Sequence, residues 1–108
     1  ILKIFNYQSY PQKKKINGHI FYVIVKNHRK SFMDFLKKNG IQTTFHYVPL
    51  HNSPAGIKYA KGKNLKNTEK LAKSLVRMPI FHNQKYFGKD YFNKINRLVT
   101  IYLKNINK

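Results

Sequence analysis

The stretch GHIFYVIVKNHRKSFMDFLKKNGI, residues 18–41, contains one strand and one helix and decides the fold class. Residues 18–26 are rich in β-branched and aromatic side chains and are too few for a buried helix, so they predict a buried strand. Apolar side chains then recur at helical spacing, namely Phe32, Met33, Phe35 and Leu36. Lysines follow in the last turn, and Gly40 stands where a left-handed cap would end an amphipathic helix of about three turns.

The next residues, IQTTFHYV at 41–48, predict a second strand. Its alternation puts four side chains on one face, those of Ile41, Thr43, Phe45 and Tyr47. His46 would then point away from its neighbour Tyr47. The strand ends at Pro49, which has no amide hydrogen to give to a neighbouring strand. Because only a short helix separates the two predicted strands, both a parallel and an antiparallel arrangement stay open.

The segment after this strand is expected to be irregular apart from one helical turn. Pro54 opens that turn, which ends at Tyr59. A longer helix follows, with Asn67 or Thr68 as its N-terminal cap. The apolar face of this helix would consist of Leu71, Ala72 and Leu75.

The end of the chain predicts a short strand and a long helix. The strand is expected at residues 77–81. The helix begins with Asp90 as its cap and has apolar residues at steps of one, three and four. These residues are Tyr91, Phe92, Ile95, Leu98, Val99, Tyr102 and Leu103. The order of elements predicts a small α+β domain.

The net charge of +19 makes anion binding the first functional possibility. Lysines that neutralise phosphates release counterions, and basic proteins bind nucleic acids in this way. However, Lys, Asn and Ile are all abundant, and their codons are rich in A and T, so a bias in base composition would raise the number of lysines without any selection for nucleic-acid binding. The lysines are also spread over the whole chain. We therefore expect mainly solvated surface charge and no nucleic-acid partner. A small basic nucleic-acid-binding module stays as the alternative function.

The sequence indicates neither a membrane-spanning segment nor disulfide bonds. No run approaches the ~18 apolar residues that a membrane helix needs, and the start of the chain has no secretory signal pattern. The chain has no cysteine. We therefore expect a soluble, cytoplasmic protein that does not bind membranes.

Candidate catalytic and metal-binding residues are few. Asp34, Glu69 and Asp90 are the only acids, and a helix accounts for each of them, so a catalytic carboxylate pair is not expected. His46 and His51 are five residues apart, which is not a usual metal-ligand spacing, and no cysteine is present to complete a site. We predict neither a metal site nor a catalytic residue in this chain.

Four motifs, in this order, carry a resemblance to a known family. They are NGHIFYVIV at 17–25, LKKNGI at 36–41, FHYVPLHNSPAG at 45–56 and NTEKLAKSLVRMPIF at 67–81. Together they resemble the C-terminal domain of the DegT-type nucleotide-sugar aminotransferases, which are pyridoxal-phosphate (PLP) enzymes of fold type I. The run HYVPLH, followed by SPAG, is most similar to the subgroup of dTDP-4-amino-4,6-dideoxygalactose transaminases.

The resemblance implies a small domain at residues 17–108, preceded by a lead-in segment at 1–16. Such a domain has a short antiparallel sheet with helices packed on one side. It closes over an active site made mainly by a large domain, which binds PLP. The chain starts at Ile1 without that large domain. We therefore expect a C-terminal piece of a longer enzyme that is inactive by itself and a homodimer when whole.

The resemblance also implies which residues face the substrate. His46 and Tyr47 are the first candidates for substrate binding and His51 is the next, whereas no residue of this chain is expected to bind the cofactor. Neutral imidazole and phenol groups can donate and accept hydrogen bonds to sugar hydroxyls. The implied substrates are glutamate, which gives the amino group, and dTDP-4-dehydro-6-deoxy-glucose, which receives it at C4. This reaction belongs to surface-polysaccharide biosynthesis, of lipopolysaccharide or common antigen.

Overall fold

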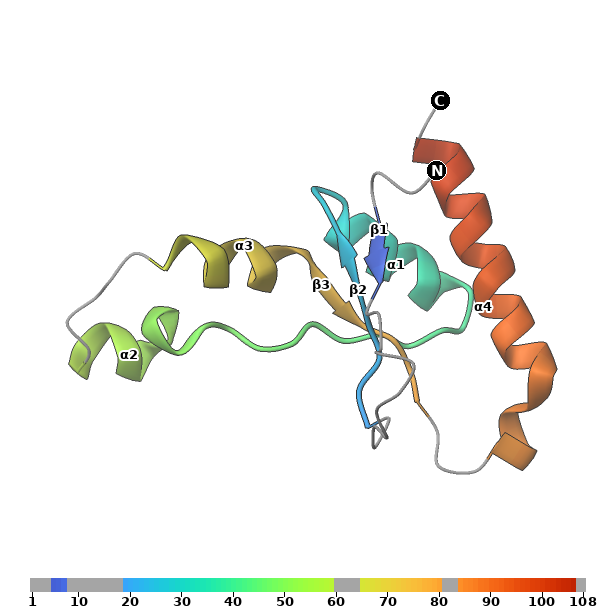
Figure 1. Cartoon of the computed structure of the whole chain (residues 1–108), viewed down its shortest axis with the longest axis horizontal. Coiled ribbons are helices and arrows are strands. Elements are labelled where there is room, and N and C mark those ends of the chain that lie inside the picture. The colour runs from blue at the N-terminus through green and yellow to red at the C-terminus, as the bar shows by residue number, and fades with distance from the viewer. Residues whose placement is uncertain (1–4, 8–18, 60–64, 81–83, 107–108) are drawn as a thin grey trace, which may run out of the picture.

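The computed structural model describes residues 5–7, 19–59, 65–80 and 84–106. The elements are β1 (Phe5–Tyr7), β2 (Tyr22–Val25), α1 (Arg29–Lys38), the 3-10 turn η1 (Leu50–Asn52), α2 (Pro54–Tyr59), α3 (Lys66–Ser74), β3 (Leu75–Arg77) and α4 (Gln84–Ile106) (Figure 1). The prediction of an α+β fold is confirmed.

A three-stranded antiparallel sheet in the order β1-β2-β3 forms the centre of the fold. Val23 in the middle strand pairs with Tyr7 on one side and with Val76 on the other. Val25 and Val76 are fully buried on the face that carries the core. The antiparallel sheet is confirmed, and β2 confirms the first predicted strand over a shorter length. β1 was not predicted, and it lies in the segment that was expected to lead into the domain.

Helix α1 ends as the sequence predicted. Gly40 has a φ of 78°, the left-handed conformation that glycine adopts without steric cost. Its amide donates to the carbonyl of Lys37 at 3.0 Å, and the amide of Ile41 donates to the carbonyl of Leu36 at 2.9 Å. These two bonds form a Schellman motif. Ile41 and Leu36 are both fully buried, so the cap also ties the end of the helix to the core.

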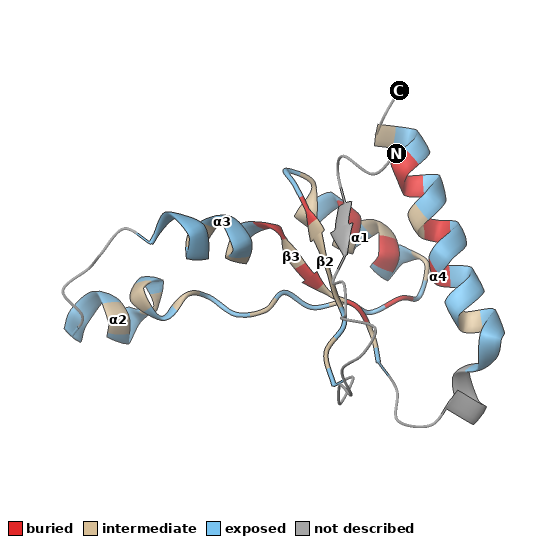
Figure 2. Ribbon diagram, viewed as in Figure 1, coloured by how far each residue is buried: buried red, intermediate tan, exposed pale blue. Residues whose placement is uncertain are grey.

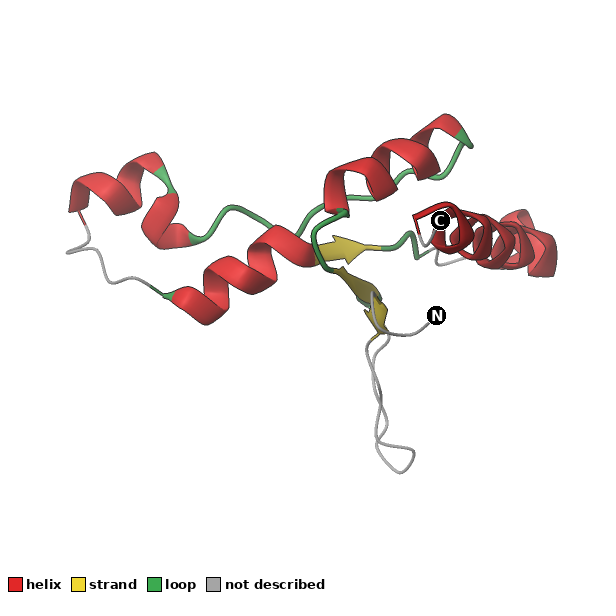
Figure 3. Ribbon diagram, turned by 90° about the horizontal axis from the view of Figure 1, so that it is seen from above, coloured by secondary structure: helices red, strands yellow, loops and turns green. Residues whose placement is uncertain are grey.

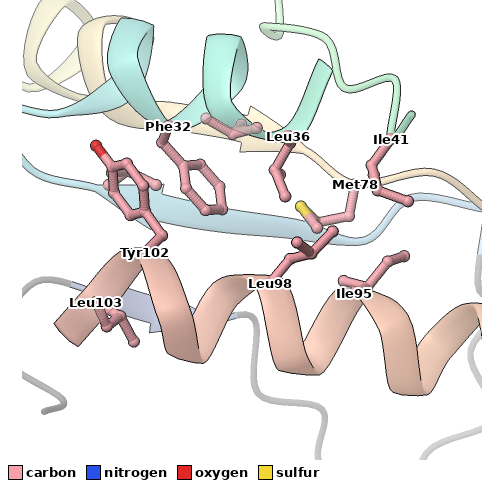
Figure 4. Packing of buried hydrophobic residues seen from close by; sticks show 10 residues of the cluster. Phe32, Leu36, Ile41, Met78, Ile95, Leu98, Tyr102 and Leu103 are labelled. Atoms are coloured by element: carbon pink, nitrogen blue, oxygen red, sulfur yellow. The ribbon is translucent and has the colours of Figure 1, made fainter. Parts of the chain in front are cut away.

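The core lies between α1, α4 and one face of the sheet (Figure 4). Helix α1 contributes Phe32 and Leu36, four residues apart on one helical face. The ring of Tyr102 on α4 meets the ring of Phe32 edge-on at 5.1 Å. Its hydroxyl lies 2.6 Å from Oγ of Ser31, so a polar contact accompanies the apolar one between the two helices. The predicted packing of helices on one side of the sheet is confirmed for α1 and α4.

Helix α4 confirms the last predicted helix and begins earlier than expected. Its backbone leaves helical geometry at Gly88, with φ 42° and ψ 178°, so the regular helix resumes after this residue. Asp90 therefore lies in the first turn after the break and is not the N-terminal cap. Of the predicted apolar residues of α4, Ile95, Leu98, Tyr102 and Leu103 are buried, whereas Phe92 is exposed. Burial raises the pKa of the Tyr91 phenol on the same helix.

The predicted second strand at 41–48 does not form. Only Thr44 makes a bridge, exchanging backbone hydrogen bonds with Arg77 of β3 at 3.2 and 2.7 Å. The chain then leaves the sheet, because Tyr47 takes a left-handed φ of 67° that no strand allows. The four side chains that alternation placed on one face separate accordingly. Ile41 is fully buried, whereas Phe45 and Tyr47 are exposed.

The predictions for the segment around α3 were also partly wrong. Leu65 is the cap of α3 and makes no side-chain capping bond, so neither Asn67 nor Thr68 caps it. The third strand begins at Leu75, immediately after the helix, and not at residue 77. Leu71, expected on the apolar face of α3, is half exposed. Helix and strand are contiguous because the backbone of Leu75 is already extended, with φ −78° and ψ 132°. The last helical residue, Ser74, donates its hydroxyl to the carbonyl of Lys70 at 2.8 Å.

Helices α2 and α3 extend away from the sheet as a two-helix arm, residues 50–59 and 65–74 (Figure 3). α2 confirms the predicted helical turn from Pro54 to Tyr59. Figure 2 shows that the buried residues gather around the sheet, α1 and α4, whereas the arm is largely exposed. The arm therefore does not take part in the core. No helix in the described ranges is both long and apolar enough to cross a membrane.

Candidate functional site

The segment that joins Thr44 to the arm carries two of the three predicted site residues. The rings of His46 and Tyr47 are in contact, with centroids 4.5 Å apart and planes at 49°. The expectation that strand alternation would separate these two side chains was wrong. The left-handed backbone at Tyr47 turns its ring back onto His46. Tyr47 is nevertheless 67% exposed, so the pair lies at the surface.

One polar atom of this pair has no hydrogen-bond partner among the residues described. Nδ1 of His46 is buried and makes no hydrogen bond with any residue that the structure describes. A buried polar atom without a partner costs about 1–3 kcal/mol, so such atoms are rare in proteins. Such an atom calls for an explanation, such as a functional role or a bound water or ion.

His51, the third predicted residue, is held by the arm. Its Nε2 lies 3.3 Å from Oε1 of Glu69 on α3, and the two side chains are partly buried. This contact joins η1 to α3. His51 does not touch the aromatic pair through any contact found among the described residues, so the structure does not bring the three predicted residues together at one point.

The contact between His51 and Glu69 gives a modest prediction. Glu69→Ala should loosen η1 and raise the hydrogen-exchange rate of the Asn52 amide about two- to fivefold, because partly exposed ion pairs contribute only about 0–1 kcal/mol. Amide exchange followed by NMR measures this. Thr68→Ala, on the exposed side of the same helix, is the control and should leave the rate unchanged. Equal rates in the two variants would show that the pair does not hold η1.

The motif SPAG, residues 53–56, fixes the start of α2. Oγ of Ser53 accepts a hydrogen bond from the amide of Gly56 at 3.0 Å, which is the standard N-terminal cap bond. The same hydroxyl donates to the carbonyl of Leu50 at 2.7 Å. A Cβ atom on Gly56 would lie 1.8 Å from that carbonyl oxygen. Only glycine therefore allows η1 and α2 to approach this closely.

A small pocket of about 150 Å³ lies between the loop and α3. Tyr47, Pro49 and Asn52 line it from the loop, and Glu69 and Arg29 are also among its walls. Tyr47 is the only one of the three predicted residues that lines this pocket. Arg29 was missed by sequence reasoning, and only the tertiary structure places it here. Its guanidinium donates to the backbone carbonyl of Ala72 on α3 and lies 5.5 Å from the ring centroid of Phe45.

Comparison with known proteins places the chain in a family. Residues 2–87, well over half of the sequence, match the model of the DegT/DnrJ/EryC1/StrS aminotransferase family. The chain belongs to this family. The resemblance seen in the sequence is thereby confirmed at the level of the family.

Two solved aminotransferases have a similar structure. The aminotransferase TlmJ from Streptoalloteichus hindustanus matches with a TM-score of 0.81 and 19% identity, over 97% of this chain and 28% of TlmJ. PseC from Helicobacter pylori, an aminotransferase involved in the biosynthesis of pseudoaminic acid, matches with a TM-score of 0.70 and 18% identity, over 81% of this chain and 24% of PseC. These similarities confirm the fold. The chain spans only about a quarter of the length of these enzymes.

Aminotransferases of the DegT/DnrJ/EryC1/StrS family generally depend on PLP. A lysine that forms a Schiff base has to be desolvated in a pocket to act as a nucleophile. Every lysine side chain that the structure describes is exposed. None of the described lysines is therefore placed to form a Schiff base with PLP. Nor do three metal-binding side chains come together anywhere in the described part of the chain.

Proposed function

We propose that this chain is the small C-terminal domain of a PLP-dependent nucleotide-sugar aminotransferase. In the whole enzyme, glutamate supplies the amino group, and C4 of dTDP-4-dehydro-6-deoxy-glucose receives it in the biosynthesis of a surface polysaccharide. PLP would be bound by a large domain outside this chain, and the enzyme would act as a cytoplasmic homodimer. The residues of this chain would shape the sugar pocket and take no part in covalent chemistry.

The pair of His46 and Tyr47 carries this proposal. A left-handed backbone costs a bulky residue about 1–3 kcal/mol, and such strain is retained mainly where a particular geometry is needed. Here the strained residue presents a largely exposed ring, so burial of Tyr47 does not account for the strain. The adjacent Nδ1 of His46 lacks a hydrogen-bond partner within the described part of the chain. A sugar hydroxyl would reach this buried nitrogen once the ring of His46 turned outward, and the exposed phenol of Tyr47 offers a second hydrogen bond to the same ligand.

The exposed apolar side chains of the arm support a large domain as its partner. Leu50, Ile57 and Tyr59 are 86%, 72% and 76% exposed and project from η1 and α2. Burying each of these side chains against a protein surface would contribute roughly 1.5–3 kcal/mol of binding free energy. The arm would therefore be more stable when a partner surface covers it. The two similar enzymes are about three and a half times as long as this chain, and the remainder of such a fold would supply the covering surface.

Amino transfer by a longer polypeptide tests the proposal. A protein that joins this chain to the coding sequence upstream of Ile1 should convert the dTDP-linked keto sugar to the amino sugar with glutamate, as followed by mass spectrometry. Tyr47→Phe and His46→Ala should each raise KM for the sugar about tenfold, because each removes one hydrogen bond to the substrate. The 108-residue chain by itself should show no turnover.

The control is Tyr59→Phe, which removes a hydroxyl from another tyrosine of the arm but keeps the ring that the large domain would cover, and it should leave KM unchanged. Equal KM values for the Tyr47 and Tyr59 variants would contradict a substrate contact at Tyr47. Turnover by the 108-residue chain alone, or no amino transfer by the longer protein, would contradict the assigned role.

A further inference from the structure

Arg29 opens helix α1 at the end where a positive charge is unfavourable. The helix dipole gives the N-terminus a partial positive charge, so acids stabilise the first turn and cations destabilise it. The first turn of α1 contains no acid, and it begins with Arg29. The side chain of Arg29 is partly buried, so it does not simply extend into water. Contacts outside α1 must therefore explain this arginine.

One of these contacts is with the C-terminal end of α3. The last four carbonyls of a helix have no amide partner within the helix. Because α3 ends at Ser74, the carbonyl of Ala72 is one of these four. It accepts a hydrogen bond from the guanidinium of Arg29. Arg29 thus lies at the unfavourable end of its own helix but at the end of α3 where a cation is stabilising.

The same guanidinium packs against the loop that carries the candidate site, residues 45–51. Its central carbon lies 5.5 Å from the ring centroid of Phe45, within the range of a cation–π contact. Phe45 directly precedes His46 and Tyr47, whose rings are in contact. The ring of Phe45 is 47% exposed, so burial in the core does not hold it in place. Arg29 therefore fixes the beginning of the loop.

The end of the loop is tied to the same place through α3. Glu69 precedes Ala72 by three residues, so the two lie on the same face of the helix. Oε1 of Glu69 lies 3.3 Å from Nε2 of His51, the last residue of the loop. Arg29, Glu69 and Tyr47 also line the same pocket of about 150 Å³. Both ends of the loop are thus held against α3 and Arg29.

We propose that Arg29 is a positioning residue for the sugar site. It joins α1 to α3 and to Phe45, and so holds the loop in the conformation that places Tyr47 beside His46. It acts through these contacts and supplies no group to the reaction. Its effect on sugar binding rests on the proposed function, whereas its effect on the loop can be measured without any substrate.

Arg29→Met in the 108-residue chain tests the effect on the loop. Methionine keeps an unbranched apolar stem and removes the guanidinium. We expect the nuclear Overhauser effect between the rings of His46 and Tyr47 to be lost. The amide of Asn52, which bonds to the carbonyl of Pro49, should exchange about three- to tenfold faster. The amide of Ile41, in the cap of α1, should exchange at the native rate, because the core around it is unchanged.

The matched control is Arg97→Met, which removes the same group from an exposed position on α4. It should leave the ring contact and both amides unchanged. An intact ring contact with native exchange of Asn52 in Arg29→Met would overturn the proposal. Equal acceleration of the Asn52 and Ile41 amides would also overturn it, because Arg29 would then only stabilise the domain as a whole.

Steady-state kinetics of the longer protein test the effect on the sugar. Arg29→Met should raise KM for the dTDP-linked keto sugar about tenfold and change kcat less than about twofold, because Arg29 affects binding and not the chemical step. Arg29→Lys should give the same KM as Arg29→Met, since lysine keeps the charge but lacks the planar group that bonds and stacks at once. A native KM for Arg29→Lys would overturn the positioning role, because charge alone would then suffice.

The outcomes for Arg29 and for the proposed function are distinguishable. If the longer protein transferred no amino group, the proposed function would fail, and the ring contact and amide exchange of the 108-residue chain would still decide the role of Arg29. If amino transfer proceeded and Arg29→Met left KM and the loop unchanged, the role of Arg29 would fail alone.

Discussion

Replacing Phe32 with alanine should destabilise the domain by about 3–5 kcal/mol. The side chain is 0% exposed and meets the ring of Tyr102, so its loss leaves a cavity between α1 and α4. Small domains have a free energy of unfolding of only about 5–15 kcal/mol in total. We expect the variant to be largely unfolded or to unfold at much lower urea concentration. Urea titration followed by circular dichroism measures the midpoint.

Phe92→Ala is the matched control for this experiment. Phe92 lies on α4 and is 43% exposed, so the same truncation there removes much less buried surface. We expect a loss below about 1 kcal/mol, partly offset because alanine favours helix more than phenylalanine does. Similar midpoints for the two variants would show that Phe32 does not anchor the packing of α1 against α4.

Gly56→Ala should separate α2 from η1 although it adds only one carbon atom. The new Cβ would lie 1.8 Å from the carbonyl oxygen of Leu50 and 3.0 Å from Cα of His51. Both are backbone atoms, so no side chain can move aside. Overpacking of this kind typically costs about 1–3 kcal/mol. We expect the amide of Ile57, which bonds to the carbonyl of Ser53, to exchange at least about tenfold faster.

The control for this substitution is Ala55→Ser, which also adds one heavy atom to α2 but at an exposed position. Its effect on the exchange of Ile57 should stay within about twofold, in line with the small difference in helix propensity. If the two variants gave the same exchange rates, the close approach at Gly56 would not constrain the arm.

The elements that local chemistry governs were predictable. Helix α1 has its apolar residues at helical spacing and a glycine at its left-handed cap, and both signals are short-range. The helical turn of α2 follows from Ser53 and Pro54 in the same way. The prediction of a strand at 41–48 was wrong because alternation indicates only that a segment is able to pair with another strand. Whether it pairs depends on a neighbour, and here only Thr44 finds one.

For the candidate site, the sequence indicated which residues to consider but not how their side chains are arranged. The motif around His46 and Tyr47 pointed to the segment, but alternation gave the wrong relation between their side chains. Nothing in the sequence indicates that Tyr47 takes a left-handed backbone, because aromatic residues rarely do so. Arg29 lies far from this segment in the sequence, and only folding brings it to Phe45 and Ala72.

The sequence by itself determined the α+β class, the helices with strong periodicity, the family resemblance and the excess of positive charge. These properties depend on residue type and on spacing within a few turns. Only the tertiary structure decided which strands pair, how the arm projects, and that Arg29 joins Phe45 to α3. These features depend on contacts between residues far apart in the chain. Their energy arises only when the core formed by α1, α4 and the sheet holds those residues together.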